Sequence, residues 1–154
     1  MDYPGRRVLL VDNGPDGALS WSPRPPARLL SPGRNLGYCP GVNLGMAEAL
    51  AGGADYVLLL NNDVRLAPGF LTPLVEALED VPTAGSAGPL VLDPDGRIWG
   101  AGGNFAFGPS VTRLRGHGRR PGKVHGFPRA VDYHTGACVL HRAEALAAAG
   151  PLDE

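Results

Sequence analysis

The sequence lacks most of the features that mark a secreted, zinc-binding or membrane-spanning protein. It has only two cysteines, Cys39 and Cys138, which lie far apart and form neither a Cys-x-x-Cys motif nor a Cys/His zinc spacing. No apolar run approaches the ~18 residues of a transmembrane helix. We therefore expect two free thiols in a reducing cytoplasm, in a protein that is at most peripheral to a membrane.

The chain also lacks an excess of charge of either sign. Its formal net charge is −1, so no nucleic acid is expected as a partner. Glycine and proline are abundant instead, with 23 and 16 residues, a level that can accompany disorder. However, the hydrophobic residues, 44% of the 154, collect into discrete runs. This length and pattern predict one folded domain over residues 1–154, with many tight turns.

The most informative stretch is a short apolar run that ends in polar residues. Tyr56–Leu60 is typical of a strand buried on both faces of a parallel sheet, and Asn61, Asn62 and Asp63 follow it directly. Ligands of open α/β sheets bind just beyond the carboxyl ends of the strands. One carboxylate flanked by two amides suits a hard divalent cation that carries a phosphorylated ligand. The alternative is a polar turn that only caps the next helix.

A similar pattern occurs near the N-terminus. Val8–Val11 is an apolar run that leads into Asp12 and Asn13, and residues 14–17 (Gly-Pro-Asp-Gly) predict a turn. Two strands that end in polar residues at one sheet edge strengthen the case for a ligand site there.

Residues 35–45 form the third informative stretch, Asn-Leu-Gly-Tyr-Cys-Pro-Gly-Val-Asn-Leu-Gly. They lead into a helix, and their glycines would let backbone N–H groups approach a bound nucleotide closely. Asn43 is predicted to be the N-cap of this helix, and Gly52 and Gly53 to end it. Capping alone is the alternative role for Asn43.

Other segments are predicted to serve packing. An apolar stripe from Phe70 to about Asp80 predicts a helix, and a second, short helix is predicted over Ala143–Ala149. Asp93 and Asp95 look like a metal pair, but a tight turn is the better interpretation.

Residues 113–129 are strongly basic. They carry six Lys or Arg and no acid. Such a segment forms either a solvated loop or a contact with a diphosphate or an anionic acceptor.

Several of these stretches resemble, in the same order, motifs of the family 2 glycosyltransferases. The matching motifs are Val-Asp-Asn-Gly at 11–14, Asn-Leu-Gly at 35–37 with Asn-Leu-Gly at 43–45, Asn-Asn-Asp at 61–63 with Pro-Gly-Phe at 68–70, and Val-Asp-x-x-Thr-Gly-Ala at 131–137. The resemblance covers nearly the whole chain, and Asn-Asn-Asp is typical of rhamnosyltransferase-like members. It implies the nucleotide-sugar-binding GT-A fold, an α/β, Rossmann-like, mostly parallel sheet flanked by helices.

The resemblance also implies a role for each matching residue. Asp12 would hydrogen-bond the nucleotide base, which suits a carboxylate that accepts from an imide N–H, and Asp63 would hold Mg²⁺ or Mn²⁺. The implied nucleotide-binding residues are Asp12, Asn13, Asn35, Gly37, Asn43, Asn61 and Asn62. Thr135, Gly136 and Ala137 would lie beside the donor sugar or the acceptor.

The implied reaction is metal-assisted, inverting transfer of a sugar from a nucleoside-diphosphate sugar to an acceptor hydroxyl. The acceptor would be a saccharide, a lipid-linked sugar or a small molecule. The general base is expected beyond Glu154, so no catalytic residue is assigned. Two alternatives stay open, a nucleotide-binding fragment without activity and a nucleotidyltransferase. The latter should carry a Gly-rich, Lys/Arg-bearing phosphate loop after its first strand, and the sequence has none.

The family's opening strand has no counterpart in the sequence. In the GT-A sheet it lies between the strands that match residues 8–11 and 57–60. We therefore expect an incomplete sheet with two exposed strand edges, which proteins normally cover. A homo-oligomer is one way to cover them.

Overall fold

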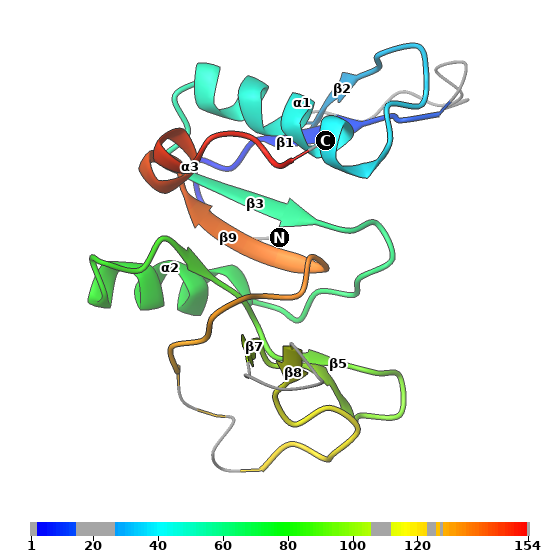
Figure 1. Ribbon diagram of the computed structural model, residues 1–154. Coiled ribbons are helices and arrows are strands. Elements are labelled where there is room, and N and C mark those ends of the chain that lie inside the picture. The colour runs from blue at the N-terminus through cyan, green and yellow to red at the C-terminus, as the bar shows by residue number, and fades with distance from the viewer. Residues whose placement is uncertain (1–2, 15–26, 106–111, 123–125, 127, 154) are drawn as a thin grey trace. The chain divides into compact units, whose positions relative to one another are not determined.

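The computed structural model describes residues 3–14, 27–105, 112–122, 126 and 128–153 (Figure 1). The chain forms two compact units. The terminal unit comprises Asp2–Val57 and Arg142–Glu154, and the central unit comprises Leu58–His141. Residues 15–17 of the predicted N-terminal turn lie outside the described residues.

The terminal unit is built on a parallel strand pair covered by a helix. Strand β1 (Val8–Val11) pairs in parallel with β2 (Ala27–Leu30), with Val8 opposite Ala27 and Val11 opposite Leu30. Helix α1 (Tyr38–Ala51) packs on β1. A Cβ added at Gly45 would lie 3.1 Å from the Val11 side chain, so a glycine here lets helix and strand approach closely.

Helix α1 begins five residues earlier than its predicted N-cap, Asn43. The prediction was wrong because Gly37 is the N-cap, with φ of 87°, a conformation that other residues rarely adopt. Pro40 then falls in the first turn, where a missing N–H costs little. The end of the helix at Gly52 and Gly53 is confirmed.

The central unit is organised around a three-stranded sheet in the order β3-β9-β4. Strand β3 (Tyr56–Leu60) leads into this unit, and β9 (Cys138–Arg142) lies between it and β4 (Ser86–Ala87) (Figure 1). Backbone bonds join Asn61 N to Ala137 O and Ala143 N to Asp55 O, so β3 and β9 run antiparallel. Strand β4 is also antiparallel to β9.

The core of the central unit lies between this sheet and helix α2 (Leu71–Asp80). Leu71, Leu74 and Leu78 are the buried side of α2, which confirms the predicted apolar stripe and its end at Asp80. Cys138 and Leu140 of β9 are each 2% exposed. Both cysteines are free, as expected, and burial raises the pKa of the Cys138 thiol, which therefore stays protonated as a packing group.

Two antiparallel hairpins complete the central unit. Strand β5 (Val91–Leu92) pairs with β6 (Ile98–Gly100), and β7 (Gly103–Phe105) pairs with β8 (Thr112–Leu114). Residues 93–96 join β5 to β6 through a bond from Gly96 N to Asp93 O of 2.9 Å. The interpretation of Asp93 and Asp95 as parts of a turn is therefore confirmed.

The expected mostly parallel sheet is not what the described residues form. They form four small sheets, in which β1 and β2 are parallel neighbours and the strand next to β3 is antiparallel. Within the described part of the chain, β1 pairs only with β2, and β3 pairs only with β9. The short helix predicted over residues 143–149 is confirmed as α3 (Ala143–Ala149), which ends at Gly150 with φ of 82°.

Candidate functional site

The end of β1 carries a buried carboxylate. Asp12 is 9% exposed, and its backbone N–H donates to Leu30 O at 2.8 Å, which continues the β1–β2 ladder by one residue. Its Oδ1 accepts from Gly14 N at 3.1 Å. The side chain is thus held at the carboxyl end of the parallel pair, where α/β proteins bind ligands.

Asn13 organises the loop that leads into α1. Its Oδ1 accepts from Leu36 N at 2.8 Å, and its Nδ2 donates to Gly37 O at 2.7 Å. A Cβ at Gly41 would lie 3.2 Å from that Nδ2, so the first turn of α1 approaches the amide closely. Asn13 therefore positions the loop, whereas its predicted contact with a nucleotide stays a prediction.

The same loop is shaped by Asn35 from the other side. Asn35 Oδ1 accepts from Gly37 N at 2.8 Å, a local Asx turn. The structure thus brings Asp12, Asn13, Asn35 and Gly37 together at one end of the terminal unit. These four are part of the predicted nucleotide-binding set.

Asn43 has a different partner from the one that the sequence indicated. It lies inside α1, where its Nδ2 donates to Leu152 O at 2.9 Å and its Oδ1 accepts from Leu152 N at 2.8 Å. This amide holds the segment that follows α3 against α1. The alternative role as an N-cap is wrong, and contact with a nucleotide stays a prediction.

In the central unit, two motifs that lie far apart in the sequence meet. Asn61 N donates to Ala137 O at 3.0 Å, so residues 61–63 and residues 135–137 lie side by side. We call them the metal turn and the sugar turn after the roles that the sequence predicts for them. Asn61, Asn62 and Asp63 are all exposed. Because α2 begins only at Leu71, the metal turn does not cap a helix, and its role in metal binding stays a prediction.

Glycines of the neighbouring strands make room for the segment that precedes the sugar turn. A Cβ at Gly100 would lie 2.8 Å from the Thr135 methyl carbon, and one at Gly88 would lie 2.5 Å from His134 Nδ1. Gly102 and Gly103 receive Val131 and Tyr133 in the same way. These four glycines are packing positions behind the predicted site that sequence reasoning missed, because only the tertiary fold shows which side chain faces each one.

Asp132 fastens the same segment to β7. Its Oδ2 accepts from Phe105 N at 2.9 Å and from Asn104 Nδ2 at 3.2 Å. Gly103 N donates to Tyr133 O at 3.0 Å. The Asp132 carboxylate therefore anchors the segment that leads into the sugar turn to strand β7.

Two half-buried histidines lie near the sugar turn. Burial lowers the pKa of His134, although a hydrogen bond to the backbone of Ser86 opposes the effect. Burial, and then the charge of nearby His134, lower the pKa of His141, which pairs with Ser86 in the β4–β9 ladder. Both imidazoles are therefore neutral at pH 7 in the folded protein and serve as packing groups.

This pair predicts a loss of stability in mild acid. Below pH 6.5 both histidines bind protons in the unfolded chain, whereas in the folded protein their lowered pKa values keep them neutral. The free energy of unfolding therefore falls as the pH drops from 6.5 towards the folded-state pKa values of His134 and His141. The slope is at most about 1.4 kcal/mol per pH unit for each additional proton. Urea unfolding of the wild type and of His134→Gln/His141→Gln measures it. The double variant should show a weaker dependence of the free energy of unfolding on pH. His117→Gln, at an exposed histidine, should leave that dependence unchanged. If the double variant kept the pH dependence of the wild type, the assignment to His134 and His141 would be wrong.

The residues of the metal turn fit a hard divalent cation. The described residues contain no group of three or more His, Cys, Asp or Glu that would hold a metal unaided. Asp63 and the amide oxygens of Asn61 and Asn62 are oxygen donors on an exposed turn, and phosphate oxygens of a ligand would have to complete the shell.

Among the described helices, none is long and apolar enough to cross a membrane.

Polar residues at the carboxyl end of the parallel β1–β2 pair and a helix packed on that pair are typical of α/β proteins that bind a ligand beyond the strands. The chain belongs to the glycosyltransferases of family 2, since the sequence model of Glycosyl transferase family 2 matches residues 2–146. It is 34% identical to the N-acetylglucosaminyl-diphospho-decaprenol L-rhamnosyltransferases of two Mycobacterium tuberculosis strains, over 96% of this chain and 55% of each relative.

Other relatives match a smaller part of the chain. An uncharacterised protein of Mycobacterium bovis is 35% identical over 58% of this chain and 33% of its own length. No solved structure gives a significant match. The chain spans about half the length of the rhamnosyltransferases that it matches.

Proposed function

We propose that the protein transfers a sugar, rhamnose or a close relative, from a nucleoside-diphosphate sugar to the hydroxyl of a lipid-linked saccharide. The observation that carries this proposal is the 3.0 Å bond from Asn61 N to Ala137 O. This bond joins residues 61–63, for which we propose contact with a metal-bound diphosphate, to residues 135–137, for which we propose contact with a sugar. Membership in family 2 and the rhamnosyltransferase activity for which the mycobacterial relatives are named support the same reaction.

The residues divide the work according to their chemistry. Asp12 would accept from the nucleotide base, and the backbone N–H groups of the loop at 35–37 would approach the nucleotide. Asp63 would hold Mg²⁺ or Mn²⁺ together with the diphosphate, and such a cation stabilises the negative charge of the leaving group. Thr135 has a hydroxyl that can hydrogen-bond a sugar, and Gly136 beside it is exposed, which leaves the backbone open to close approach.

The stereochemical course that we propose is inversion. A carboxylate general base would take the proton from the acceptor hydroxyl while the sugar–phosphate bond breaks. We assign no residue of this chain as that base. The proposal is tested by incubating the protein with nucleoside-diphosphate sugars, rhamnose donors among them, and lipid-linked acceptors, and by reading the anomeric configuration of the product by NMR. Hydrolysis without transfer, or retention, would contradict it.

Asp12→Asn should weaken nucleotide binding while leaving its metal dependence intact. A neutral amide accepts more weakly than a carboxylate, and loss of a charged hydrogen bond weakens binding by about 1.5–3 kcal/mol. Calorimetric titration with a nucleoside diphosphate, with and without Mn²⁺, measures both quantities. Asp55→Asn, an exposed aspartate that precedes β3, is the matched control. Loss of the metal effect with nucleotide affinity unchanged would reverse the roles of Asp12 and Asp63.

A further inference from the structure

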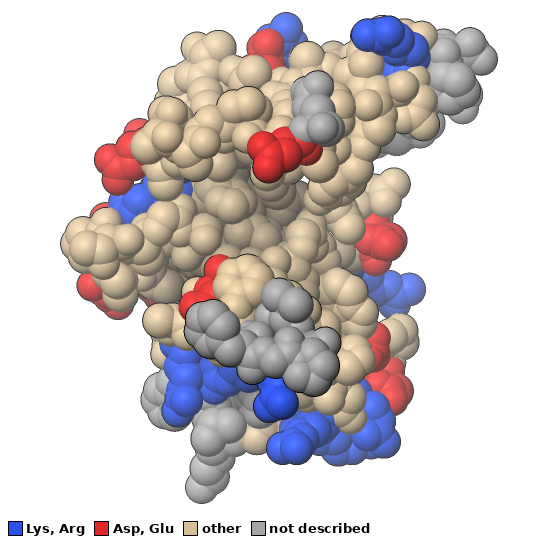
Figure 2. Space-filling view, in the orientation of Figure 1, with Lys and Arg blue, Asp and Glu red and all other residues tan. Residues whose placement is uncertain are grey.

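The hairpins of the central unit carry a concentration of positive charge. Arg113, Arg115, Arg119 and Arg120 lie within eight residues, and residues 112–122 contain no acid. Arg113, Arg119 and Arg120 are exposed and Arg115 is partly exposed. We call these four arginines the basic surface. Figure 2 shows Lys and Arg gathered over the part of the central unit that holds β5 to β8.

The turn that presents Arg119 and Arg120 is held in place by main-chain bonds. Ile98 N donates to Arg119 O and Gly118 N donates to Ile98 O, both at 2.8 Å, so residues 118–119 pair with β6. Arg119 N donates to Gly116 O at 3.0 Å, which closes the turn. The backbone that carries the two exposed guanidinium groups is therefore already ordered. Less conformational entropy is lost when these groups bind a ligand than if they lay on a flexible loop.

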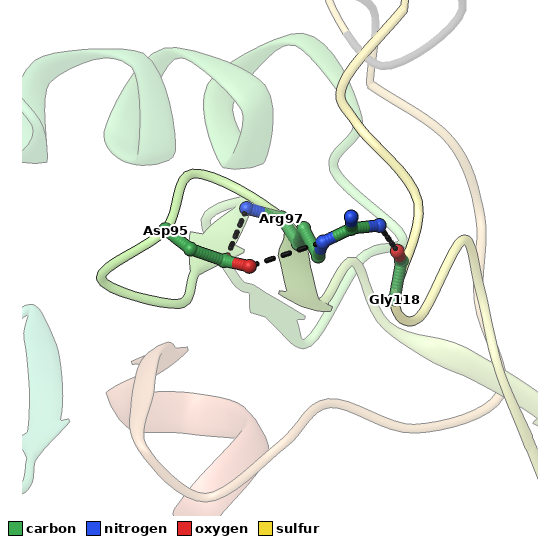
Figure 3. Close-up of polar contacts among 3 residues, drawn as sticks. All are labelled: Asp95, Arg97 and Gly118. Carbon is green, nitrogen blue, oxygen red and sulfur yellow. Dashed lines mark hydrogen bonds and ion pairs between the residues drawn. The ribbon is translucent and has the colours of Figure 1, made fainter.

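Arg97 holds this turn to the neighbouring one. Its guanidinium donates to Asp95 Oδ2 at 3.0 Å through Nε and to Gly118 O at 2.8 Å through a terminal nitrogen (Figure 3). Asp95 is therefore paired with Arg97, and Asp132 accepts from Asn104 and Phe105. The charge of Asp95 is thus offset by that of Arg97, whereas Asp132 accepts from neutral groups and keeps its negative charge. Residues 91–122 contain five Arg and two Asp, a net charge of +3 without His, so an excess of positive charge remains on these hairpins.

Large apolar side chains are exposed on the same hairpins. Phe105 is 60% exposed, Trp99 39% and Leu114 37%. They come from β7, β6 and β8, the strands that carry or adjoin the basic surface. Side chains alternate along a strand, so Leu114 and, across the register, Phe105 lie on the opposite face of the β7–β8 hairpin from Arg113. Trp99 follows Ile98, which pairs with residues 118–119. An exposed aromatic ring near arginines is typical of proteins that sit at the head-group level of a bilayer.

We propose that the basic surface docks the protein on the anionic head groups of a lipid membrane. Each arginine near such a surface gains from the negative surface potential, and Trp99, whose neighbour Ile98 pairs with residues 118–119, can enter the interface. The inference concerns membrane contact alone, so it is tested without a sugar donor.

The experiment is co-sedimentation with vesicles of phosphatidylcholine, with and without about one third phosphatidylglycerol. The wild type should bind the anionic vesicles and not the neutral ones. Arg119→Ala/Arg120→Ala should lower the partition coefficient by about 20- to 30-fold, since each arginine near the surface accounts for about fivefold. Arg119→Lys/Arg120→Lys, which keeps the charge, should retain most of the binding.

The matched control removes the same charge from the terminal unit. Arg6→Ala/Arg34→Ala changes two exposed arginines there and should lower the partition coefficient less than about threefold, an effect of net charge alone. Equal losses in the two double variants would overturn the proposal. Equal binding to neutral vesicles would also overturn it, as would binding of single-stranded RNA or inorganic pyrophosphate through Arg119 and Arg120 without binding to vesicles.

Discussion

Asp63→Ala should abolish the increase in nucleotide affinity that Mn²⁺ causes. Asp63 is the only carboxylate of the metal turn, and the neighbouring amides of Asn61 and Asn62 are weak ligands for a hard cation. Loss of a group that merely supports a metal ligand lowers metal affinity by about 10- to 100-fold. Removal of the ligand itself should therefore exceed about 100-fold. Calorimetric titration of a nucleoside diphosphate in the presence and absence of Mn²⁺ measures the effect.

Two variants separate a metal ligand from a general effect of charge. Asp80→Ala removes an exposed carboxylate at the end of α2 and should leave the Mn²⁺ dependence unchanged. Asp63→Glu keeps the carboxylate but moves it by one methylene, and it should retain part of the dependence. If Asp63→Ala bound nucleotide with the same Mn²⁺ dependence as the wild type, the metal would have to be held elsewhere.

The strand ends were predictable because their chemistry is local. Apolar runs at Val8–Val11 and Tyr56–Leu60, each followed by polar residues, are strands β1 and β3. Both strands end directly before the polar residues that the sequence predicted to form a site. Helix α2 was predictable for the same reason, since its buried leucines recur at helical spacing.

The start of α1 could not be read from the sequence because two residues compete for the same role. Asn is a good N-cap, and Asn43 is followed by apolar residues at helical spacing, from Leu44 to Ala51. Gly37, however, adopts the positive φ that turns the chain into the helix, and Asn13, far away in the sequence, binds its carbonyl. That long-range bond decides the start of the helix. Once the helix begins early, the Asn43 amide is available for Leu152.

The sheet and the support of the sugar turn depend on pairings between distant segments. The pattern of β3 is compatible with a parallel or an antiparallel neighbour, and the structure pairs it with β9, which lies about 80 residues away in the chain. In the same way, nothing local connects Gly88 with His134 or Gly100 with Thr135. The resemblance to family motifs identified the turns at 61–63 and 135–137. The hydrogen bond between the two turns could be found only from the folded structure.

Gly102→Ala should be among the most destabilising single changes in the central unit. Gly102 has φ of 70°, and an added Cβ would lie 2.7 Å from Val131 Cγ1 and 3.0 Å from Val131 Cβ. Positive φ costs an alanine about 1–2 kcal/mol. Overpacking adds about 1–3 kcal/mol, because the branched valine has few other rotamers. We therefore expect a loss of about 2–5 kcal/mol in the free energy of unfolding, measured with urea.

Gly118→Ala separates backbone strain from the steric clash. Gly118 also has positive φ, 75°, but an added Cβ there would meet nothing within 4 Å. It should therefore lose only the ~1–2 kcal/mol of strain. Val131→Ala in the Gly102→Ala background should then be less destabilising than in the wild type, by about 0.5–3 kcal/mol of coupling. Equal losses for Gly102→Ala and Gly118→Ala, with no coupling to Val131, would show that the 131–135 segment does not pack against this glycine, and the sugar turn would then lack its support.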